Sequence, residues 1–254
     1  MAMEASAQAG ASDPKRKVVF CIPTVERPFS PMLEALAASV PAIQAAGWDE
    51  GCVSEIGNPY ISAARNIMLR KALDAKADVV VFLDHDLSWQ PLDLLSLIET
   101  GGDVVAGTYR FKHEPEKYMG KLAVVPGTMR PIQRGDGCIK ATSIPAGFLK
   151  ITRNTVNSFI EAYPELCYGE KCSPHVDLFN HGAMDGIWYG EDYGFSYRWT
   201  KAGGELWIRP DLDISHHLPD GQAFPGNFLD YMLRQPGGSK AGQPMRQPSG
   251  KVLP

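Results

Sequence analysis

Two aspartates flank a histidine directly after an uninterrupted apolar run, in the segment VVVFLDHDLSW at residues 79–89. Asp84 and Asp86 lie one residue apart on the turn that leaves this run, so both carboxylates can point toward one hard cation. Oxygen ligands of this kind suit Mg²⁺ or Mn²⁺, which commonly remain bridged to the phosphates of a substrate. A polar turn at the end of a strand would also explain the triplet, so the choice depends on the other residues.

A second acidic pair and a histidine pair follow much later in the chain. Glu191 and Asp192 open the segment GEDYGFSYRW, where the helix macrodipole alone favours acidic residues and where a carboxylate could also act as a general base. His216 and His217 lie in the segment LDISHHLPDG. Adjacent residues of an extended strand point in opposite directions, so at most one of these histidines joins a given site.

The elements that must position these side chains alternate between strands and helices. Strands are expected at 17–24, 52–57, 78–84 and 103–110, and helices between them at 31–47, 60–77 and 91–101. Pro41 is expected to kink or split the first helix. The continuous apolar run before Asp84 fits a central strand covered on both faces. This order predicts a Rossmann-like α/β sheet that binds its ligand at the carboxyl ends of the strands, where the aspartates lie.

Further strands and a helix are expected beyond residue 110, followed by a long loop at 165–190 that would hold substrate contacts. A short helix at 191–202, a strand at 204–209 and the histidine segment at 211–217 close the expected domain. We predict one domain over 16–234. Residues 1–15 and the Pro/Gly-rich residues 235–254 are expected to be flexible tails.

Composition indicates a soluble, cytoplasmic protein. The 254 residues carry a formal net charge of −4, which gives no general sign of nucleic-acid or anionic-membrane binding. The five cysteines are odd in number and show no CxxC spacing, so neither a disulfide framework nor a zinc site is expected. No apolar run reaches the roughly 18 residues of a membrane span, and no signal peptide is recognised at the start.

Taken in order, these segments resemble GT-A-fold glycosyltransferases, and more narrowly the small bacterial and phage-associated proteins related to glycosyltransferase family 2. The resemblance spans 17 to about 230 and depends on ISAARN, VVVFLDHDLSWQP, DVVAGTYRFK, IPAGFLKITR, GEDYGFSYRW and DISHH. It implies a single α/β GT-A domain with a mixed, mostly parallel central sheet. It also implies metal-dependent transfer of a sugar from a nucleotide-sugar to an acceptor hydroxyl, with Mn²⁺ or Mg²⁺ as cofactor.

The resemblance also implies roles for individual residues. Asp84 and Asp86 match the metal-binding DxD motif, and His216 matches a histidine that completes the metal shell. His217 remains a rival because Leu218 stands where the family often has glycine. Asp192, with Glu191 beside it, matches the catalytic base of inverting members. Contacts to the donor are implied for Pro23, Thr24, Glu26, Arg65, Asn66, Asp84, His85, Gly147 and Phe148.

The acceptor and the stereochemistry stay open at this stage. A UDP- or GDP-sugar is the expected donor, and the acceptor could be a glycan, a metabolite or a hydroxymethylated DNA base. A DNA acceptor would require base flipping and a basic strip. The stretch containing Arg110, Lys112, Lys117, Lys121, Arg130 and Arg134 could supply that strip, although a solvated face explains it equally well.

Two other functions compete with glycosyl transfer. A nucleotidyltransferase would share the sheet and the metal-bound aspartates, but it would usually carry a glycine-rich, basic loop after the first strand. The segment IPTVERPFSP has no such loop. A non-catalytic module that binds nucleotide-sugars would bind its ligand without metal and would not depend on Asp192.

Overall fold

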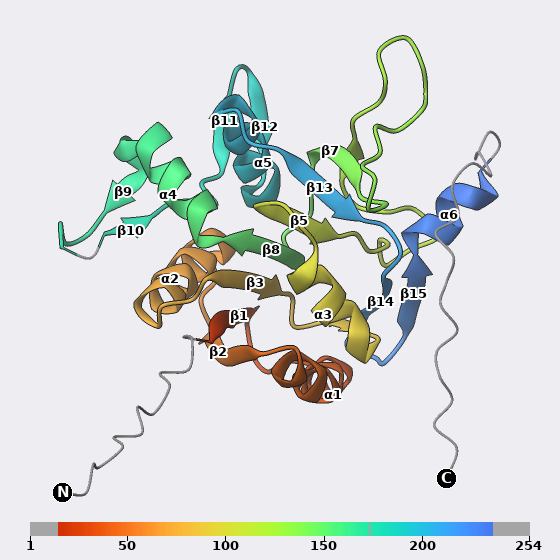
Figure 1. Ribbon diagram of the computed structural model, residues 1–254, viewed down its shortest axis with the longest axis horizontal. Coiled ribbons are helices and arrows are strands. Elements are labelled where there is room, and N and C mark those ends of the chain that lie inside the picture. Colours follow the sequence, from red (N-terminus) through yellow and green to blue (C-terminus); the bar gives the residue numbers. More distant parts are fainter. Residues whose placement is uncertain (1–14, 173, 236–254) are drawn as a thin grey trace, which may run out of the picture.

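The computed structural model describes residues 15–172 and 174–235, arranged around one large central sheet (Figure 1). Apart from residues 15 and 235, the two expected tails lie outside the described residues. The sheet has eight strands in the order β2-β1-β3-β8-β5-β13-β7-β6. Their bounds are β1 Arg16–Thr24, β2 Trp48–Ile56, β3 Val79–Leu83, β5 Val104–Gly107, β6 Lys121–Leu122, β7 Ile139–Ser143, β8 Phe148–Thr152 and β13 Leu206–Arg209.

Strand directions confirm the expected mixed, mostly parallel sheet. Strand β1 pairs in parallel with β2 and β3, and β13 pairs in parallel with β5. Strands β8 and β7 run against all their neighbours. The first half therefore follows the expected Rossmann-like alternation, through α1 (Ser30–Ala45), α2 (Ile61–Asp74) and α3 (Pro91–Glu99). The architecture agrees with the GT-A fold class implied by the resemblance.

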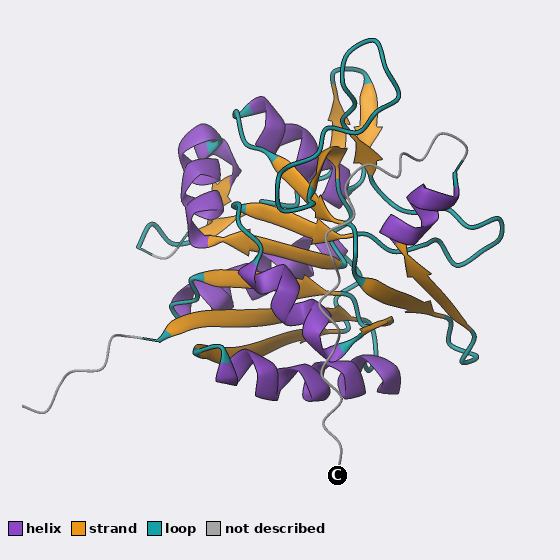
Figure 2. Cartoon of the chain, turned by 45° about the vertical axis from the view of Figure 1, so that its right-hand side comes forward, coloured by secondary structure: helices purple, strands orange, loops and turns teal. Residues whose placement is uncertain are grey.

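The hydrophobic core consists of two layers on opposite faces of the sheet, and helices flank both layers (Figure 2). Helices α2, α4 (Arg153–Ala162) and α5 (Glu191–Lys201) cover one layer, whereas α1 and α3 cover the other. Strand β3 contributes alternate residues to the two layers, and all five of its residues are buried. The apolar run before Asp84 is therefore a central strand covered on both faces, as predicted.

Helix α1 is not split at Pro41, contrary to one of the two expected outcomes. It runs without interruption from Ser30 to Ala45 with Pro41 inside it. Proline removes one helical hydrogen bond, but buried Ser39 and Ile43 hold the helix on both sides of it. The Trp89 indole also donates to the Ser39 hydroxyl at 3.0 Å and so links the helix to the strand at Leu87–Trp89.

A smaller antiparallel sheet, β15-β14-β4, adjoins the central one. It contains β4 (Leu87–Trp89), β14 (Asp213–His217) and β15 (Ala223–Asn227), and α6 (Phe228–Arg234) follows it. Neither β15 nor α6 was expected from the sequence. This sheet places the site, because His216 pairs with Leu87 and the His217 amide donates to the Asp86 carbonyl at 2.8 Å.

The segment expected to be a loop at 165–190 contains short elements. Two hairpins form in it, β9 (Cys167–Tyr168) with β10 (His175–Val176), and β11 (Gly182–Met184) with β12 (Ile187–Tyr189). A 3-10 turn at Pro164–Leu166 precedes them. These strands have only two or three residues each, too few to produce a recognisable alternating pattern.

The five cysteines all fall within the described residues and are free thiols. Among the helices of the described ranges, none has both the length and the apolar character needed to cross a membrane.

Candidate functional site

A cavity of about 270 Å³ opens where the carboxyl ends of β1 and β3 meet the start of α5 and strand β14. Eight of the residues singled out in the sequence contribute to its wall. The lining residues are Pro23, Ile61, Arg65, Asp84, His85, Asp86, Tyr109, Met119, Ala146, Glu191, Asp192 and His216. The fold thus gathers in one place side chains that lie far apart in the sequence.

Arg65 joins two of the acidic segments. It projects from α2, is only 2% exposed, and its Nη2 lies 2.8 Å from Asp84 Oδ1. Its Nη1 contacts Glu191 Oε1, and the guanidinium lies 5.6 Å from the centre of the Phe179 ring. Burial opposes the charge of this side chain, but the carboxylates of Asp84 and Glu191 outweigh burial and raise the pKa of Arg65. Both carboxylates are therefore held by a permanent cation.

Asp84 is held from its other side by Gly147 and Tyr109. The Asp84 amide donates to the Gly147 carbonyl at 2.8 Å, and the Tyr109 hydroxyl donates to Asp84 Oδ2 at 3.3 Å. A Cβ atom on Gly147 would lie 2.1 Å from the Tyr109 hydroxyl and 2.3 Å from Asp84 Oδ2. Position 147 therefore requires glycine, because the carboxylate and the phenol occupy the space of any side chain.

Asp86 faces a histidine and a lysine. His216 Nε2 lies 3.4 Å from Asp86 Oδ2, and the Lys112 ammonium donates to the same oxygen. Burial alone would raise the pKa of Asp86, but the neighbouring side chains of His216 and Lys112 hold that pKa well below its ordinary value. Asp86 is therefore a carboxylate at any pH near neutrality.

The ring of His216 has a defined orientation. Its Nδ1 lies 3.0 Å from the Arg110 carbonyl, which can only accept, so Nδ1 carries a hydrogen and Nε2 faces Asp86. His217, the rival ligand, points to the other side of β14, and its Nε2 lies 2.7 Å from the Ser88 hydroxyl. Of the two histidines, the fold places His216 beside Asp86.

Asp192 lies at the start of α5, close to Glu191 but with different partners. Its Oδ1 accepts the Tyr193 amide at 2.7 Å, and no ion pair to Asp192 occurs among the described residues. Burial, followed by the negative charge of Glu191, raises the pKa of Asp192 to about 6. A carboxylate with this pKa is ionised at neutral pH and is a stronger base than an ordinary aspartate.

Five of the residues implied by the resemblance do not line the cavity. Asn66 is buried behind it, where Nδ2 donates to Asp177 Oδ1 at 2.5 Å and Oδ1 accepts the Phe179 amide at 3.4 Å. Phe148 belongs to the core and packs 5.1 Å from Trp89, centre to centre. Gly147 lies beneath Asp84, Thr24 is buried, and Glu26 is exposed outside the lining.

Tyr109 and Lys112 are site residues to which the sequence analysis assigned no donor or metal role. Both belong to DVVAGTYRFK, which carried part of the resemblance. Tyr109 follows the end of β5, and the carboxyl end of a parallel strand is where ligand contacts are expected. That position could have identified Tyr109, whereas no sequence pattern indicates the inward direction of Lys112.

Two side-chain atoms, Asp86 Oδ2 and His216 Nε2, are placed to bind a metal ion together. Among the residues described, no group of three or more His, Cys, Asp and Glu side chains is close enough together to hold an ion. Asp86 Oδ2 and His216 Nε2 nevertheless face one another, and the Nδ1 bond to a carbonyl is the usual support of a metal-bound histidine. Two protein ligands fit an Mg²⁺ or Mn²⁺ ion that takes its remaining ligands from water and substrate phosphates.

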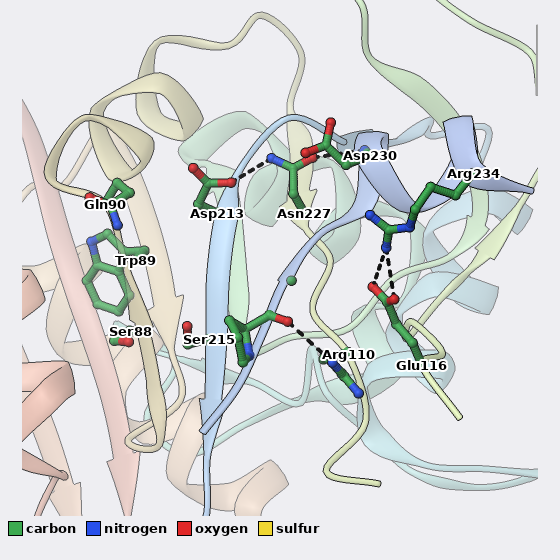
Figure 3. A pocket seen from close by; sticks show the side chains of 12 residues that line it. Ser88, Trp89, Gln90, Arg110, Glu116, Asp213, Ser215, Asn227, Asp230 and Arg234 are labelled. Carbon is green, nitrogen blue, oxygen red and sulfur yellow. Dashed lines mark hydrogen bonds and ion pairs between the residues drawn. The ribbon is translucent and has the colours of Figure 1, made fainter. Parts of the chain in front are cut away.

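A second, larger cavity of about 430 Å³ lies between β14, β15 and α6 (Figure 3). Its polar groups are largely engaged with one another: Arg234 lies 2.8 Å from Glu116, and Asn227 donates to Asp213 at 2.7 Å. None of the residues implied by the resemblance lines it. The smaller cavity is therefore the candidate functional site.

No protein-family model and no curated protein sequence matches this chain. Among solved structures, A197 from STIV is similar over 83% of this chain and 94% of its own, with a TM-score of 0.50 and 18% identity. Drosophila beta-1,4-galactosyltransferase 7, solved with manganese, UDP-Gal and xylobiose, covers 76% of this chain and 64% of its own at a TM-score of 0.40 and 14% identity. The similarity to S. aureus TarS 1–349, solved with UDP-GlcNAc, extends over 76% of this chain and 55% of TarS 1–349, with a TM-score of 0.37 and 12% identity.

At 18% identity, the likeness to A197 concerns the fold alone. The likenesses to the galactosyltransferase and to TarS, with TM-scores below 0.5, add nothing to that conclusion. The chain therefore shares its mixed α/β fold with a known structure over most of the length of both proteins.

Proposed function

We propose that this chain is a metal-dependent glycosyltransferase that moves a sugar from a UDP- or GDP-sugar to an acceptor hydroxyl. One observation carries the proposal, namely that Asp84, Asp86, Asp192 and His216 line a single cavity at the carboxyl end of the sheet. Glycosyl transfer needs a site for a diphosphate and its counter-ion and a base for the acceptor. The cavity offers residues suited to both tasks.

Asp86 and His216 are the residues that would hold the ion. A divalent cation there would stabilise the negative charge that develops on the leaving nucleoside diphosphate. Asp84 faces the same cavity, but its two oxygens already accept from Arg65 and Tyr109. Each of these oxygens keeps a second lone pair, so Asp84 can share in metal binding without losing either contact. Pro23 and Ile61 supply an apolar edge on the side of β1 and α2, which suits the nucleoside.

Asp192 is our candidate for the general base. Glu191 is engaged by Arg65, whereas Asp192 accepts only the amide of the next residue among the bonds described for its carboxylate. A raised pKa of about 6 suits a group that must remove a proton from a hydroxyl at neutral pH. In a retaining enzyme the same carboxylate would orient the acceptor instead, and the anomeric form of the product decides between the two.

The acceptor remains a choice among a glycan, a metabolite and a hydroxymethylated DNA base. The basic stretch proposed for DNA is only partly available for phosphate contacts. Arg110 pairs with Glu114, Arg134 pairs with Asp136 at 2.7 Å, and Lys112 pairs with Asp86. Lys117, Lys121 and Arg130 are exposed and remain candidates for that role.

Product analysis tests the proposal against the two competing functions. A glycosyltransferase releases a nucleoside diphosphate from a nucleotide-sugar, whereas a nucleotidyltransferase releases pyrophosphate from a nucleoside triphosphate and a sugar phosphate. We expect nucleoside diphosphate, released slowly with water as acceptor and faster when a suitable acceptor is added. Pyrophosphate release would assign the chain to the nucleotidyltransferases, and donor binding with no product would assign it to the binding modules.

A further inference from the structure

Lys112 lies at the tip of a hairpin that starts and ends in the candidate site. The hairpin spans 108–120, with Arg110 bridged to Tyr118 and the Phe111 amide donating to the Lys117 carbonyl at 2.9 Å. Tyr109 and Met119, at its base, both line the cavity. The backbone of the hairpin thus brings the tip residue back over the aspartates.

The Lys112 side chain points inward rather than into solvent. Its ammonium contacts Asp86 Oδ2, and the side chains of Lys112 and Asp86 are only 26% and 13% exposed. An exposed lysine gains little from such a pair, because water screens it and ordering a long side chain costs entropy. Here the carboxylate is already shielded from water, and the ammonium lies beside it together with His216.

The ammonium and a divalent cation would compete for the same atom. His216 Nε2 also faces Asp86 Oδ2, at 3.4 Å. An ion bound by Asp86 and His216 would therefore meet the positive charge of Lys112 at that oxygen, and the two cations would repel each other strongly at such a short range. The two cations therefore oppose each other at Asp86 Oδ2.

We propose that Lys112 is an internal counter-ion that occupies Asp86 in the ligand-free protein and moves onto the donor diphosphate when a divalent cation takes Asp86. The inference rests on the proposed function, because it gives Lys112 a place in the same site. A lysine ammonium suits the second position, since it binds phosphate as a mobile point charge with three donors on a flexible stem. Lys112 then couples metal binding to donor binding.

The first test measures Mn²⁺ affinity without any nucleotide, from the loss of the free-ion signal in electron paramagnetic resonance titrations. Lys112→Met should bind Mn²⁺ about fivefold to tenfold tighter than the wild type, the effect of removing a partly buried competing charge worth about 1 kcal/mol. Lys112→Arg keeps the charge and should show no such gain. Lys117→Met is the matched control, because it removes an exposed charge of the same hairpin, and it should behave as wild type.

The second test measures UDP and GDP binding by calorimetry at saturating Mn²⁺. Lys112→Met should bind the preferred diphosphate about tenfold more weakly, the loss of one charge-assisted phosphate contact worth about 1.4 kcal/mol. Equal Mn²⁺ affinity in Lys112→Met and the wild type, or an equal gain in Lys117→Met, would overturn the proposal that Lys112 is the counter-ion of Asp86. If Lys112→Met binds the diphosphate as tightly as the wild type, the proposal that Lys112 moves onto the donor diphosphate is overturned.

Failure of the proposed function gives a different pattern. If the wild type binds neither diphosphate and releases no nucleotide, glycosyl transfer is wrong, and the nucleotide-free Mn²⁺ titration alone decides whether Lys112 competes at Asp86. If neither the wild type nor Lys112→Met binds Mn²⁺, the counter-ion proposal is overturned as well.

Discussion

Glu191 and Asp192 are neighbours in the chain whose side chains meet different surroundings. Glu191 contacts the buried guanidinium of Arg65, whereas Asp192 accepts one backbone amide. Adjacent carboxylates whose environments differ are a common sign that they have different tasks. The geometry supports a structural role for Glu191 and a chemical role for Asp192.

Replacing Asp192 by Asn should reduce transfer without reducing stability. Loss of a general base lowers turnover by about 100-fold to 10,000-fold. The folded-state pKa of about 6 lies above the ordinary aspartate value of 3.8, so stability from this group is full below about pH 4 and is lost as pH rises through about 6. At pH 7.5 the neutral amide side chain of Asp192→Asn avoids the cost of burying a charged carboxylate, and Tm should stay equal or rise.

Glu161→Gln, on the exposed face of α4, is the control for charge removal. Wild-type turnover in Asp192→Asn would contradict the assignment.

The same pKa predicts the pH dependence of the reaction. A base must be deprotonated to act, so kcat/KM should rise about tenfold per pH unit below the pKa of about 6 and level off above it. The profile is measured from pH 5 to 8 at saturating metal. A rate that stays flat across that range would exclude Asp192 as the titrating base.

At the scale of elements, Arg65 ties α2 to the end of β3 and to the start of α5. Removing a buried member of such a network leaves its partners uncompensated, at a cost of about 3 kcal/mol. Arg65→Met should therefore lower the free energy of unfolding in urea by about that amount. Adding Glu191→Gln should restore part of the loss, since one uncompensated charge is removed.

Lys71→Met is the control on the same helix for Arg65→Met. Lys71 forms a pair of 3.1 Å with Glu55, and its side chain is 50% exposed, so its removal should cost less than about 1 kcal/mol. Equal losses for Lys71→Met and Arg65→Met would show that the buried network does not join these elements.

Gly147, directly before β8, tests how closely the elements pack beneath Asp84. Gly147→Ala places a methyl group 2.3 Å from Asp84 Oδ2, so the carboxylate must move. We expect at least about tenfold weaker donor binding, together with a lower Tm. Gly135→Ala is the control, because a Cβ there meets no heavy atom within 4 Å. Donor binding equal to wild type in Gly147→Ala would mean that Asp84 does not contribute to the site.

Some of these elements can be recognised from sequence for clear physical reasons. A buried central strand reads as a continuous apolar run, so β3 and the turn that carries Asp84 and Asp86 were predictable. Asn66 was not. Consecutive helical residues diverge by about 100°, so a helix that turns Arg65 into the cavity turns Asn66 away from it. The strands of the 165–190 region are too short to leave a pattern.

At the scale of the whole molecule, the site depends on contacts between segments far apart in the chain. The small β15-β14-β4 sheet brings His216 to Asp86, and the 108–120 hairpin brings Lys112 to the same oxygen. Periodicity and local motifs do not encode such contacts, so only the resemblance favoured His216, and His217 stayed a rival. Their strand pairing separates them. We propose that residues 16–234 form the domain that holds these contacts, because both core layers share one sheet.

The most direct test of the account is metal-dependent donor binding, measured as the change in Tm with UDP-, GDP-, CMP- and dTDP-sugars in Mn²⁺, Mg²⁺ or EDTA. We predict that one nucleotide class raises the Tm of the wild type in the presence of metal, that EDTA removes the rise, and that Asp86→Ala lacks it while keeping the fold. A donor-induced rise that persists in EDTA or in Asp86→Ala, or no rise with any donor, would contradict a metal-dependent glycosyltransferase.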